Sequence, residues 1–247
     1  MVFCSEEEIN ILMIANSFGV NINHYVHQIA EKLGKKINIG ILYIPGCSLK
    51  THCDNLSGSK KVYEYFENGI STKEQISILD GIKRRKWNYI SLQQFSGESG
   101  IYDSYFPYID QLIKYVNDNC SDFDFLLHET WAYKSTTSHP WFQKYNKNAA
   151  EMALFINNVY INLHQKYGFK IIKSGEVIQY LVDKTDYDFY QEDGFHLNDL
   201  GEYAVGLNLV HMLLNISNFS NLYIPTELED DKCRDIEKLL NENKLYL

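Results

Sequence analysis

The stretch "INILMIANSFGV" at residues 9–20 decides the fold. Five of its first six residues are apolar, and the pattern then breaks into Ala-Asn-Ser-Phe-Gly. A short apolar run followed by small and polar residues is typical of a buried strand that turns into a helix. Ser17 lies at this turn, where it either caps the following helix or acts as a nucleophile on a tight corner.

Other apolar runs along the chain resemble this first one. They predict strands at 9–14, 37–43, 88–93, 123–128 and 169–173. The runs are nearly continuous rather than alternating, which indicates a parallel sheet covered on both faces. Helical patterns lie between them at 22–34, 59–67, 72–83, 107–119, 145–167, 174–183, 198–215 and 227–243.

Repeated strand-then-helix units predict an α/β fold, a three-layer α/β/α sandwich around a five-stranded parallel sheet. Ser71-Thr72, with Glu74 and Gln75 close behind, resembles the start of a helix. No linker rich in Gly, Pro or Ser interrupts the chain, so we expect one domain over 1–247. Its core spans about 9–214, and a helical tail covers 221–247.

Charge and composition exclude several classes of function. The chain has 247 residues, 45% of them hydrophobic, with a formal charge of −9 and Arg only at 84, 85 and 234. An acidic chain with so few Arg is a poor candidate for binding nucleic acid or an anionic membrane. A neutral or weakly charged small molecule or glycan is the expected partner, and the sequence does not indicate an oligomeric state.

The cysteines and the N-terminus give an expectation about location. Five scattered Cys without a C-x-x-C pair predict neither a disulfide framework nor a zinc knuckle. The start "MVFCSEEEIN" has no basic and apolar leader pattern, and no apolar run approaches the roughly 20 residues of a membrane span. We therefore expect a cytoplasmic protein, or a secreted or periplasmic one if a leader has been removed.

Small and polar residues follow the predicted strands. In a parallel sheet, ligands bind beyond the carboxyl ends of the strands. Ser17 follows the first strand, Gly46 the second, Gln93 and Gln94 the third, and Glu129-Thr130-Trp131 the fourth. These residues are expected to converge on one surface.

A second polar motif stands near the C-terminus in "QEDGFHLNDLGEY". Asp193 and His196 are close enough for the carboxylate to accept a hydrogen bond from Nδ1–H of the ring. Nε2 would then be free to take a proton from a hydroxyl, and Ser17 is the candidate. Backbone N–H groups of Ser17 and Gly46 are candidate donors to an oxyanion, because a glycine lets a substrate approach closely.

These blocks resemble the SGNH, or GDSL-like, hydrolase superfamily in type and chain order. "IANSFG" is similar to the block that carries the nucleophile, "YIPGCSL" to the block of the oxyanion glycine, and "DGFHLN" to the terminal Asp-x-x-His block. The resemblance covers about 9–214. "LQQFSGESG", "ETWAY" and "HPWF" also resemble an uncharacterised bacterial subgroup similar to carbohydrate esterases.

The resemblance implies a flavodoxin-like fold and a Ser17–His196–Asp193 triad without a cofactor. The third-block Asn of the superfamily is absent, and Gln93-Gln94 stand in its place. Carbohydrate acetylesterases of the superfamily can place a Gln there, so Gln94, nearer the strand's end, is the expected third oxyanion donor, with Gln93 as the alternative.

Two further residues are candidates for substrate contact. Trp131 falls in a predicted loop at a strand end, where aromatic rings can stack on sugars or fill the core. His52 adjoins the second block and is expected to line the cleft or cap a helix. His52-Cys53 and His128-Glu129 lie on different segments, and zinc needs three or four ligands at workable spacing, so no metal site is expected.

The leading hypothesis is a serine esterase that removes a short acyl group, in particular acetyl, from a carbohydrate. One alternative is a carbohydrate-binding protein that keeps the fold but has lost turnover through the altered third block. Another is a lipid or thioester hydrolase, which would need a long apolar groove.

Overall fold

The computed structural model describes residues 8–216 and 223–243. The N-terminal residues searched for a leader and parts of the predicted C-terminal tail (221–222 and 244–247) lie outside this range. A membrane crossing would require a longer and more apolar helix than any found in the described ranges.

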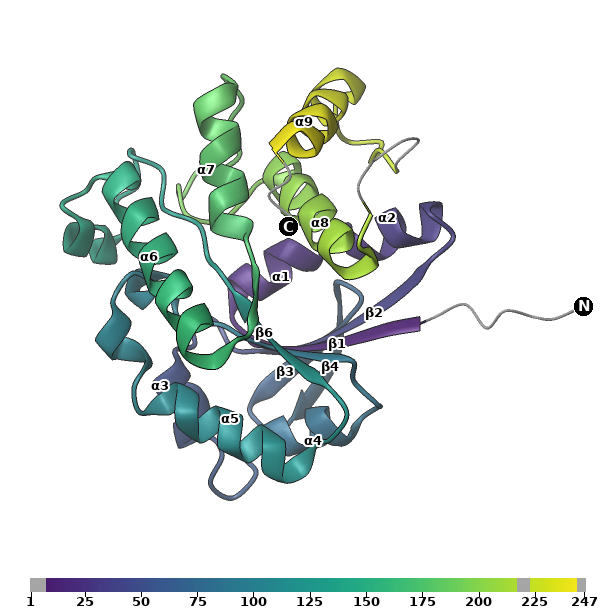
Figure 1. The fold of residues 1–247 in the computed structure, drawn as a ribbon, viewed down its shortest axis with the longest axis vertical. Helices are drawn as coiled ribbons and strands as arrows, with labels where there is room; N and C mark the ends of the chain where they lie inside the picture. The colour runs from purple at the N-terminus through teal and green to yellow at the C-terminus, as the bar shows by residue number, and fades with distance from the viewer. Residues whose placement is uncertain (1–7, 217–222, 244–247) are drawn as a thin grey trace, which may run out of the picture.

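A seven-stranded sheet runs through the middle of the molecule (Figure 1). Its strands, in spatial order, are β4 (Ile70–Ile76), β3 (Tyr63–Glu67), β2 (Lys36–Tyr43), β1 (Glu8–Ala15), β5 (Tyr89–Leu92), β6 (Asp124–His128) and β7 (Lys170–Ile172). The five strands from β2 to β7 are parallel, whereas β3 and β4 are antiparallel to their neighbours. The predicted α/β class is confirmed, but the predicted five-stranded sheet is wrong because the sheet is mixed and has two more strands.

Helices cover both faces of this sheet. They are α1 (Ser17–Asn23), α2 (Val26–Lys32), α3 (Leu49–Asp54), α4 (Ile78–Lys83), α5 (Tyr108–Asn119), α6 (Ala149–Tyr167), α7 (Ser174–Lys184), α8 (Asp199–Leu214) and α9 (Asp230–Asn243). In Figure 1, α3, α4 and α5 lie below the sheet, and α1, α2, α7 and α8 lie above it. Helix α9 packs on the outer side of α8.

The two extra strands occupy segments that were predicted as helices at 59–67 and 72–83. Strands β3 and β4 form a hairpin, and Asn68 and Gly69 at its turn have φ of +49° and +79°. Asn-Gly is the preferred pair in such a turn because both residues tolerate positive φ. The buried Tyr63 and Tyr65 alternate with Glu64, which is the two-residue period of a strand.

Helix α4 consequently starts later than predicted. Ser77, not Ser71-Thr72, is its N-cap, and Ser77 and Asp80 form a reciprocal capping box. The predicted helix 22–34 is also different, because α1 already begins at Ser17 and a break at His24-Tyr25 separates it from α2. The long helix predicted at 145–167 begins at Ala149 and ends, as predicted, at Gly168, whose φ is +72°.

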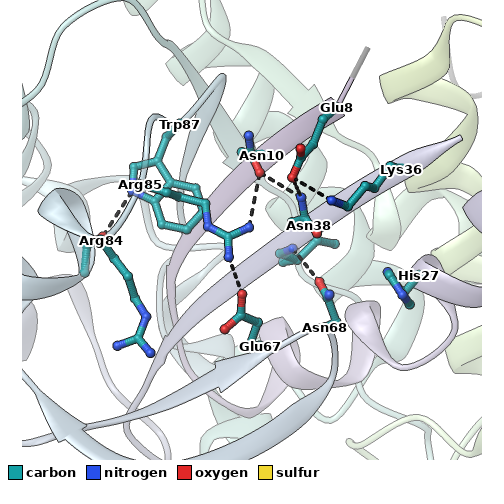
Figure 2. A network of polar contacts seen from close by, with 12 residues as sticks. Glu8, Asn10, His27, Lys36, Asn38, Glu67, Asn68, Arg84, Arg85 and Trp87 are labelled. Atoms are coloured by element: carbon teal, nitrogen blue, oxygen red, sulfur yellow. Dashed lines mark hydrogen bonds and ion pairs between the residues drawn. The ribbon is translucent and has the colours of Figure 1, made fainter. Parts of the chain in front are cut away.

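A polar network fixes the amino end of the central strands (Figure 2). Asn10 on β1 accepts hydrogen bonds from Asn38 Nδ2 at 2.9 Å and from Arg85 Nη1 at 3.2 Å. Arg85 also bridges to Glu67 at the end of β3, so the network ties the hairpin to the sheet. It lies at the sheet edge opposite the carboxyl ends of the parallel strands, where the candidate site is found.

Candidate functional site

The corner between β1 and α1 presents Ser17 at the carboxyl edge of the sheet. Asn16 is the N-cap of α1, and its Oδ1 accepts a hydrogen bond from Phe18 N–H at 3.1 Å. Asn16 therefore fills the capping role, and the hydroxyl of Ser17 points to another part of the chain. Gly19 keeps the corner tight, because a Cβ there would lie 2.4 Å from Cβ of Ala15.

Ser17, His196 and Asp193 form a continuous chain of hydrogen bonds. His196 Nε2 lies 2.8 Å from Ser17 Oγ, and His196 Nδ1 lies 2.7 Å from Asp193 Oδ2. A carboxylate can only accept, so Nδ1 carries the ring proton and Nε2 is left to accept the proton of the serine. The structure thus brings together three residues separated by up to 179 positions in the sequence.

Backbone donors hold the carboxylate of Asp193 in place. Its Oδ1 accepts hydrogen bonds from Phe195 N–H and His196 N–H, both at 2.9 Å. Partial burial alone would raise the pKa of Asp193, but these two bonds and the His196 ring together lower it. Asp193 is therefore ionised at neutral pH and available to stabilise a protonated His196.

Gly46 lies across from the Ser17 corner on the loop after β2. Its φ is +58°, in the left-handed region that favours glycine. Asn16 Nδ2 donates to Cys47 O at 3.1 Å, and this bond ties the loop to the corner. The N–H groups of Ser17 and Gly46 thus belong to two segments that Asn16 holds together.

The two glutamines do not face the site as predicted. The Nε2 of Gln94 donates to Ser104 O and Oγ, both at 3.1 Å, and its Oε1 accepts from Leu49 N–H and Phe95 N–H. Gln94 is fully buried, so its amide is already used to fix surrounding loops.

Gln93 is likewise engaged beneath the Ser17 corner. Its Nε2 donates to Asn16 Oδ1 at 2.5 Å, and its Oε1 accepts from His128 Nδ1 at 3.0 Å. Gln93 therefore orients the N-cap of α1 from behind. The geometry offers neither amide to an oxyanion.

Trp131 supports the site from inside rather than contacting a substrate. The ring has no exposed surface, stacks on Phe18 with centroids 4.1 Å apart, and donates Nε1–H to Phe195 O at 2.8 Å. The prediction of a substrate-binding role does not fit this burial. Trp131 instead connects helix α1, which begins at Ser17, to the turn that carries His196.

His52 is also remote from solvent. Its Nδ1 lies 3.0 Å from Tyr63 OH and 3.5 Å from Cys47 Sγ, and burial lowers its pKa to about 3. A fully buried neutral imidazole on the inner side of α3 cannot line the cleft, so the predicted contact with substrate is wrong. His52 instead packs behind the loop that carries Gly46.

Ser17, Gly46 and His196 line one cavity of about 180 Å³. The other residues around it are Asn16, Phe18, Tyr43, Pro45, Phe95, Ser96, His139 and Phe195. Most of these side chains are aromatic or small, so the cavity suits a small, uncharged group beside Ser17. Sequence analysis missed Tyr43 at the end of β2 and Phe195 in a loop as parts of this wall, because the sequence does not reveal which side chains turn toward a common cavity.

His139 is a second histidine in this cavity whose role sequence reasoning missed. Its ring packs against Tyr133 and Phe195, with centroids 4.7 Å away in each case. Nδ1 accepts a hydrogen bond from Trp141 N–H at 3.3 Å, which assigns the ring proton to Nε2. Burial lowers the pKa of His139, so the ring is neutral at neutral pH. The motif "HPWF" was the available signal.

A separate group of side chains has the composition of a metal site. His24, Asp199 and Glu202, around the start of α8, have candidate ligand atoms within 4.8 Å of one another. Glu202 is, however, already bound by Asn21 Nδ2 and by the His24 ring. These contacts satisfy the buried carboxylate without an ion, so we assign no metal to this group.

Comparison with known proteins identifies the family. The model of the DUF4886 family, described as a domain of unknown function, matches residues 10–238, and the chain therefore belongs to this family. A crystal structure of a DUF4886 family protein from Bacteroides uniformis has a TM-score of 0.90 and 29% identity, covering 97% of this chain and 96% of that chain. No curated protein matches the chain.

More distant structures share the fold. A protein from Slackia heliotrinireducens, proposed to be an SGNH hydrolase, has a TM-score of 0.58 and 16% identity, covering 83% of this chain and 98% of that chain. A mutant of an acetyl-xylooligosaccharide esterase from Geobacillus has a TM-score of 0.53 and 10% identity, covering 89% and 100%. At such identities the likeness shows an SGNH-hydrolase-like fold.

Proposed function

We propose that this member of the DUF4886 family is a serine esterase that removes a short acyl group, in particular acetyl, from a carbohydrate. The observation that carries the proposal is the Ser17 Oγ–His196 Nε2 contact of 2.8 Å, backed by Asp193 and opening into a small cavity. A nucleophile, its base and an orienting acid in this geometry are the requirements of acyl transfer.

The first half of the reaction forms an acyl-enzyme. Ser17 Oγ attacks the ester carbonyl while His196 Nε2 takes the hydroxyl proton, and Asp193 stabilises the resulting imidazolium. The carbonyl oxygen becomes an oxyanion that receives the N–H groups of Ser17 and Gly46. The bond to the leaving alcohol then breaks, and the proton on Nε2 passes to the alcohol oxygen.

Water completes the cycle. His196 Nε2 takes a proton from water as the water oxygen attacks the acyl carbon of the acyl-enzyme. A second oxyanion forms and collapses, the bond to Ser17 Oγ breaks, and the proton on Nε2 returns to the serine. The products are the free acid and the original enzyme.

Both glutamine amides are engaged elsewhere, so a third oxyanion donor would have to be another residue. His139 lines the same cavity, and its Nε2 carries a proton that the Trp141 bond leaves free for donation. We assign this role to His139. A neutral donor suits the oxyanion without competing with His196 for a proton.

Two features favour a short acyl group on a sugar. The cavity of about 180 Å³ beside Ser17 suits a small acyl group better than a long hydrocarbon chain. Half-buried aromatic rings of Tyr43, Phe95 and Phe195 form part of its wall, and such rings pack well on the C–H faces of sugars. The resemblance to a Geobacillus acetyl-xylooligosaccharide esterase supports the same choice.

Hydrolysis of p-nitrophenyl esters tests the reaction. Wild type should cleave the acetate faster than the butyrate and the octanoate, and Ser17→Ala should reduce acetate turnover to background. Ser135→Ala, an exposed serine in a loop, is the matched control and should keep full activity. Equal rates for wild type and Ser17→Ala would refute the nucleophile, and faster cleavage of the octanoate would point to a lipid hydrolase.

The carbohydrate part requires a second substrate. The kcat/KM for acetate release should be higher with acetylated xylo-oligosaccharide than with p-nitrophenyl acetate. Binding of the oligosaccharide without hydrolysis of any ester would instead identify a sugar-binding protein.

A further inference from the structure

A second cavity lies away from Ser17, between α6 and α7 beside the end of β6. Its volume is about 440 Å³, which is larger than that of the cavity at Ser17. Its walls are formed by Glu129, Thr130, Ala132, Ala150, Ala153, Leu154, Ile156, Asn157, Gly175, Glu176, Gln179, Tyr180 and Asp183. A cavity of this size can hold a small organic molecule.

Glu129 is a buried acid at the inner wall of this cavity. Its side chain is almost fully buried, and Oε2 accepts a hydrogen bond from Glu176 N–H at 3.1 Å. The side-chain amide of Asn157 on α6 also acts on this carboxyl as a hydrogen-bond donor. Gly175 lets α7 pack closely against the segment that follows β6, because a Cβ at position 175 would lie 2.3 Å from Thr130 O. The reaction proposed for Ser17 does not use this acid.

The charge around Glu129 is unbalanced. Glu176 and Asp183 also line the cavity, whereas no Lys, Arg or His does so within the described residues. Lys173 acts on Glu129 from just before α7 but does not reach the cavity wall. The rest of the lining is mostly apolar, with Ala132, Ala150, Ala153, Leu154 and Ile156. Ionising a buried acid without a cationic partner is costly, and a cation in the cavity would offset this cost.

We propose that the cavity between α6 and α7 binds a small organic cation, namely an ammonium group carried on a short apolar body. The ammonium group lies against Glu129 and Glu176 and donates to their oxygens. The apolar body packs on the alanines of α6 and on Leu154, and the ring of Tyr180 closes one side. This site is independent of the proposed esterase, because it uses none of the groups around Ser17.

The segment 129–133 separates the two cavities. Glu129, Thr130 and Ala132 face the cation site, whereas Trp131 packs on Phe18 of the nucleophile helix. A ligand bound in the larger cavity therefore does not occupy the cavity at Ser17. The two can be measured separately.

Ionisation of Glu129 gives the site a measurable signature. Burial and the charge of Glu176 together raise the pKa of Glu129 to about 8, against the lowering effects of the Glu176 N–H, Asn157 and Lys173. Tyr160 on α6, and Tyr180 and Asp183 on α7, are the other titratable groups on this side. At neutral pH the acid is mostly protonated, so a bound cation, which favours the carboxylate, must displace its proton.

Calorimetric titration with matched probes tests the proposal. Phenethylammonium should bind with a Kd of about 1 mM or tighter, as expected for a small ligand in a fitting cavity. Phenethyl alcohol should bind at least about tenfold weaker, and hydrocinnamate should not bind, because only the ammonium complements the acids. Repeating the titration in buffers of different ionisation enthalpy should show release of close to one proton per ligand at pH 7.

Three variants make the test specific. Glu129→Gln should remove both the preference for the cation and the proton release, and Ala153→Phe should fill the cavity and abolish binding. Asp186→Asn removes an exposed negative charge beyond α7 and should change neither the binding of the cation nor the proton release. Thermal unfolding and far-UV circular dichroism report on whether each variant is folded.

Equal binding of the alcohol and the cation, or undiminished binding by a folded Ala153→Phe, would overturn the proposal. So would the absence of phenethylammonium binding to wild type. Because no ester is involved, these outcomes leave the esterase proposal untouched. Loss of esterase activity in Ser17→Ala likewise says nothing about the cation site.

Discussion

Asp193 does two tasks with one carboxylate. Two backbone N–H groups hold its Oδ1, and the His196 ring holds its Oδ2. The two backbone bonds to Oδ1 fix the turn. The bond between Oδ2 and His196 Nδ1 selects the tautomer in which Nε2 can accept a proton. A substitution that keeps the size of the side chain can therefore separate folding from catalysis.

We expect Asp193→Asn to fold normally and to lose turnover by about 10⁴-fold, the loss known for such a change in another triad. The amide NH₂ would face Nδ1 and favour the ring form with its proton on Nε2, which cannot accept the proton of Ser17. The measurement is kcat with p-nitrophenyl acetate. Glu192→Gln removes the adjacent exposed charge and should keep kcat. A loss of less than tenfold in Asp193→Asn would contradict the proposed role.

His139 allows the third donor to be tested directly. His139→Phe keeps a ring against Tyr133 and Phe195 but removes the Nε2–H group. We expect kcat to fall by about 10²-fold with little change in KM, because an oxyanion donor acts in the transition state. Thermal unfolding should show a small fall in the midpoint, because the variant also loses the Nδ1 acceptor of Trp141 N–H. An unchanged kcat in a folded variant would exclude His139 as the donor.

The geometry at single residues shows where sequence reasoning works and where it fails. Asp193 and His196 are three positions apart on one turn, so their contact follows from local spacing. The orientations of Gln93 and Gln94 depend on Ser104, Leu49 and His128, which come from other elements. The burial of Trp131 under the site has the same origin. No local pattern could separate a donor from a structural amide.

At the level of elements, the strands with continuous apolar runs were predicted, and the β3–β4 hairpin was not. The central parallel strands are covered on both faces, so their residues are uniformly apolar. The hairpin lies at the edge of the sheet, and most residues of β4 are at least partly exposed. Its period of two is visible only in Tyr63 and Tyr65. The stronger signal was the Asn68-Gly69 pair, which is typical of a tight hairpin turn.

Gly69→Ala tests the hairpin turn. The φ of +79° is strained for alanine, and the added Cβ would lie 3.3 Å from Asn23 O. We expect the free energy of unfolding to fall by about 1–2 kcal/mol, measured by urea denaturation. Ile70→Thr, at a position that is 73% exposed, keeps a β-branched side chain and should change stability by no more than about 0.5 kcal/mol. A neutral Gly69→Ala would mean that the turn has another conformation.

On the scale of the whole molecule, the two edges of the sheet have different tasks. The amino edge is closed by Asn10, Asn38, Arg85 and Glu67, which pair with one another (Figure 2). At the carboxyl edge, Ser17 and His196 line an open cavity instead. Polar groups that satisfy one another stabilise the fold, whereas groups directed into a cavity remain available to a ligand.

Helix α9 belongs to this packed structure although it was predicted as a tail. Cys233, Ile236 and Leu240 are buried on its inner face, and Tyr203 of α8 donates to Glu237 Oε1 at 3.2 Å. Helix α8 in turn follows directly after His196. A loss of packing between α9 and α8 should therefore affect the stability of the region that carries His196.

We expect Ile236→Ala to lower the free energy of unfolding by about 2–4 kcal/mol, because it leaves a cavity between α9 and α8. Urea denaturation followed by far-UV circular dichroism and by residual esterase activity should give coincident transitions, both shifted to lower urea. Lys238→Ala, exposed on the same helix, should leave the midpoint unchanged. If α9 were an appendage, Ile236→Ala would alter only a minor early transition and activity would persist to the wild-type midpoint. Coincident shifts would instead mean that α9 unfolds together with the sheet that positions Ser17.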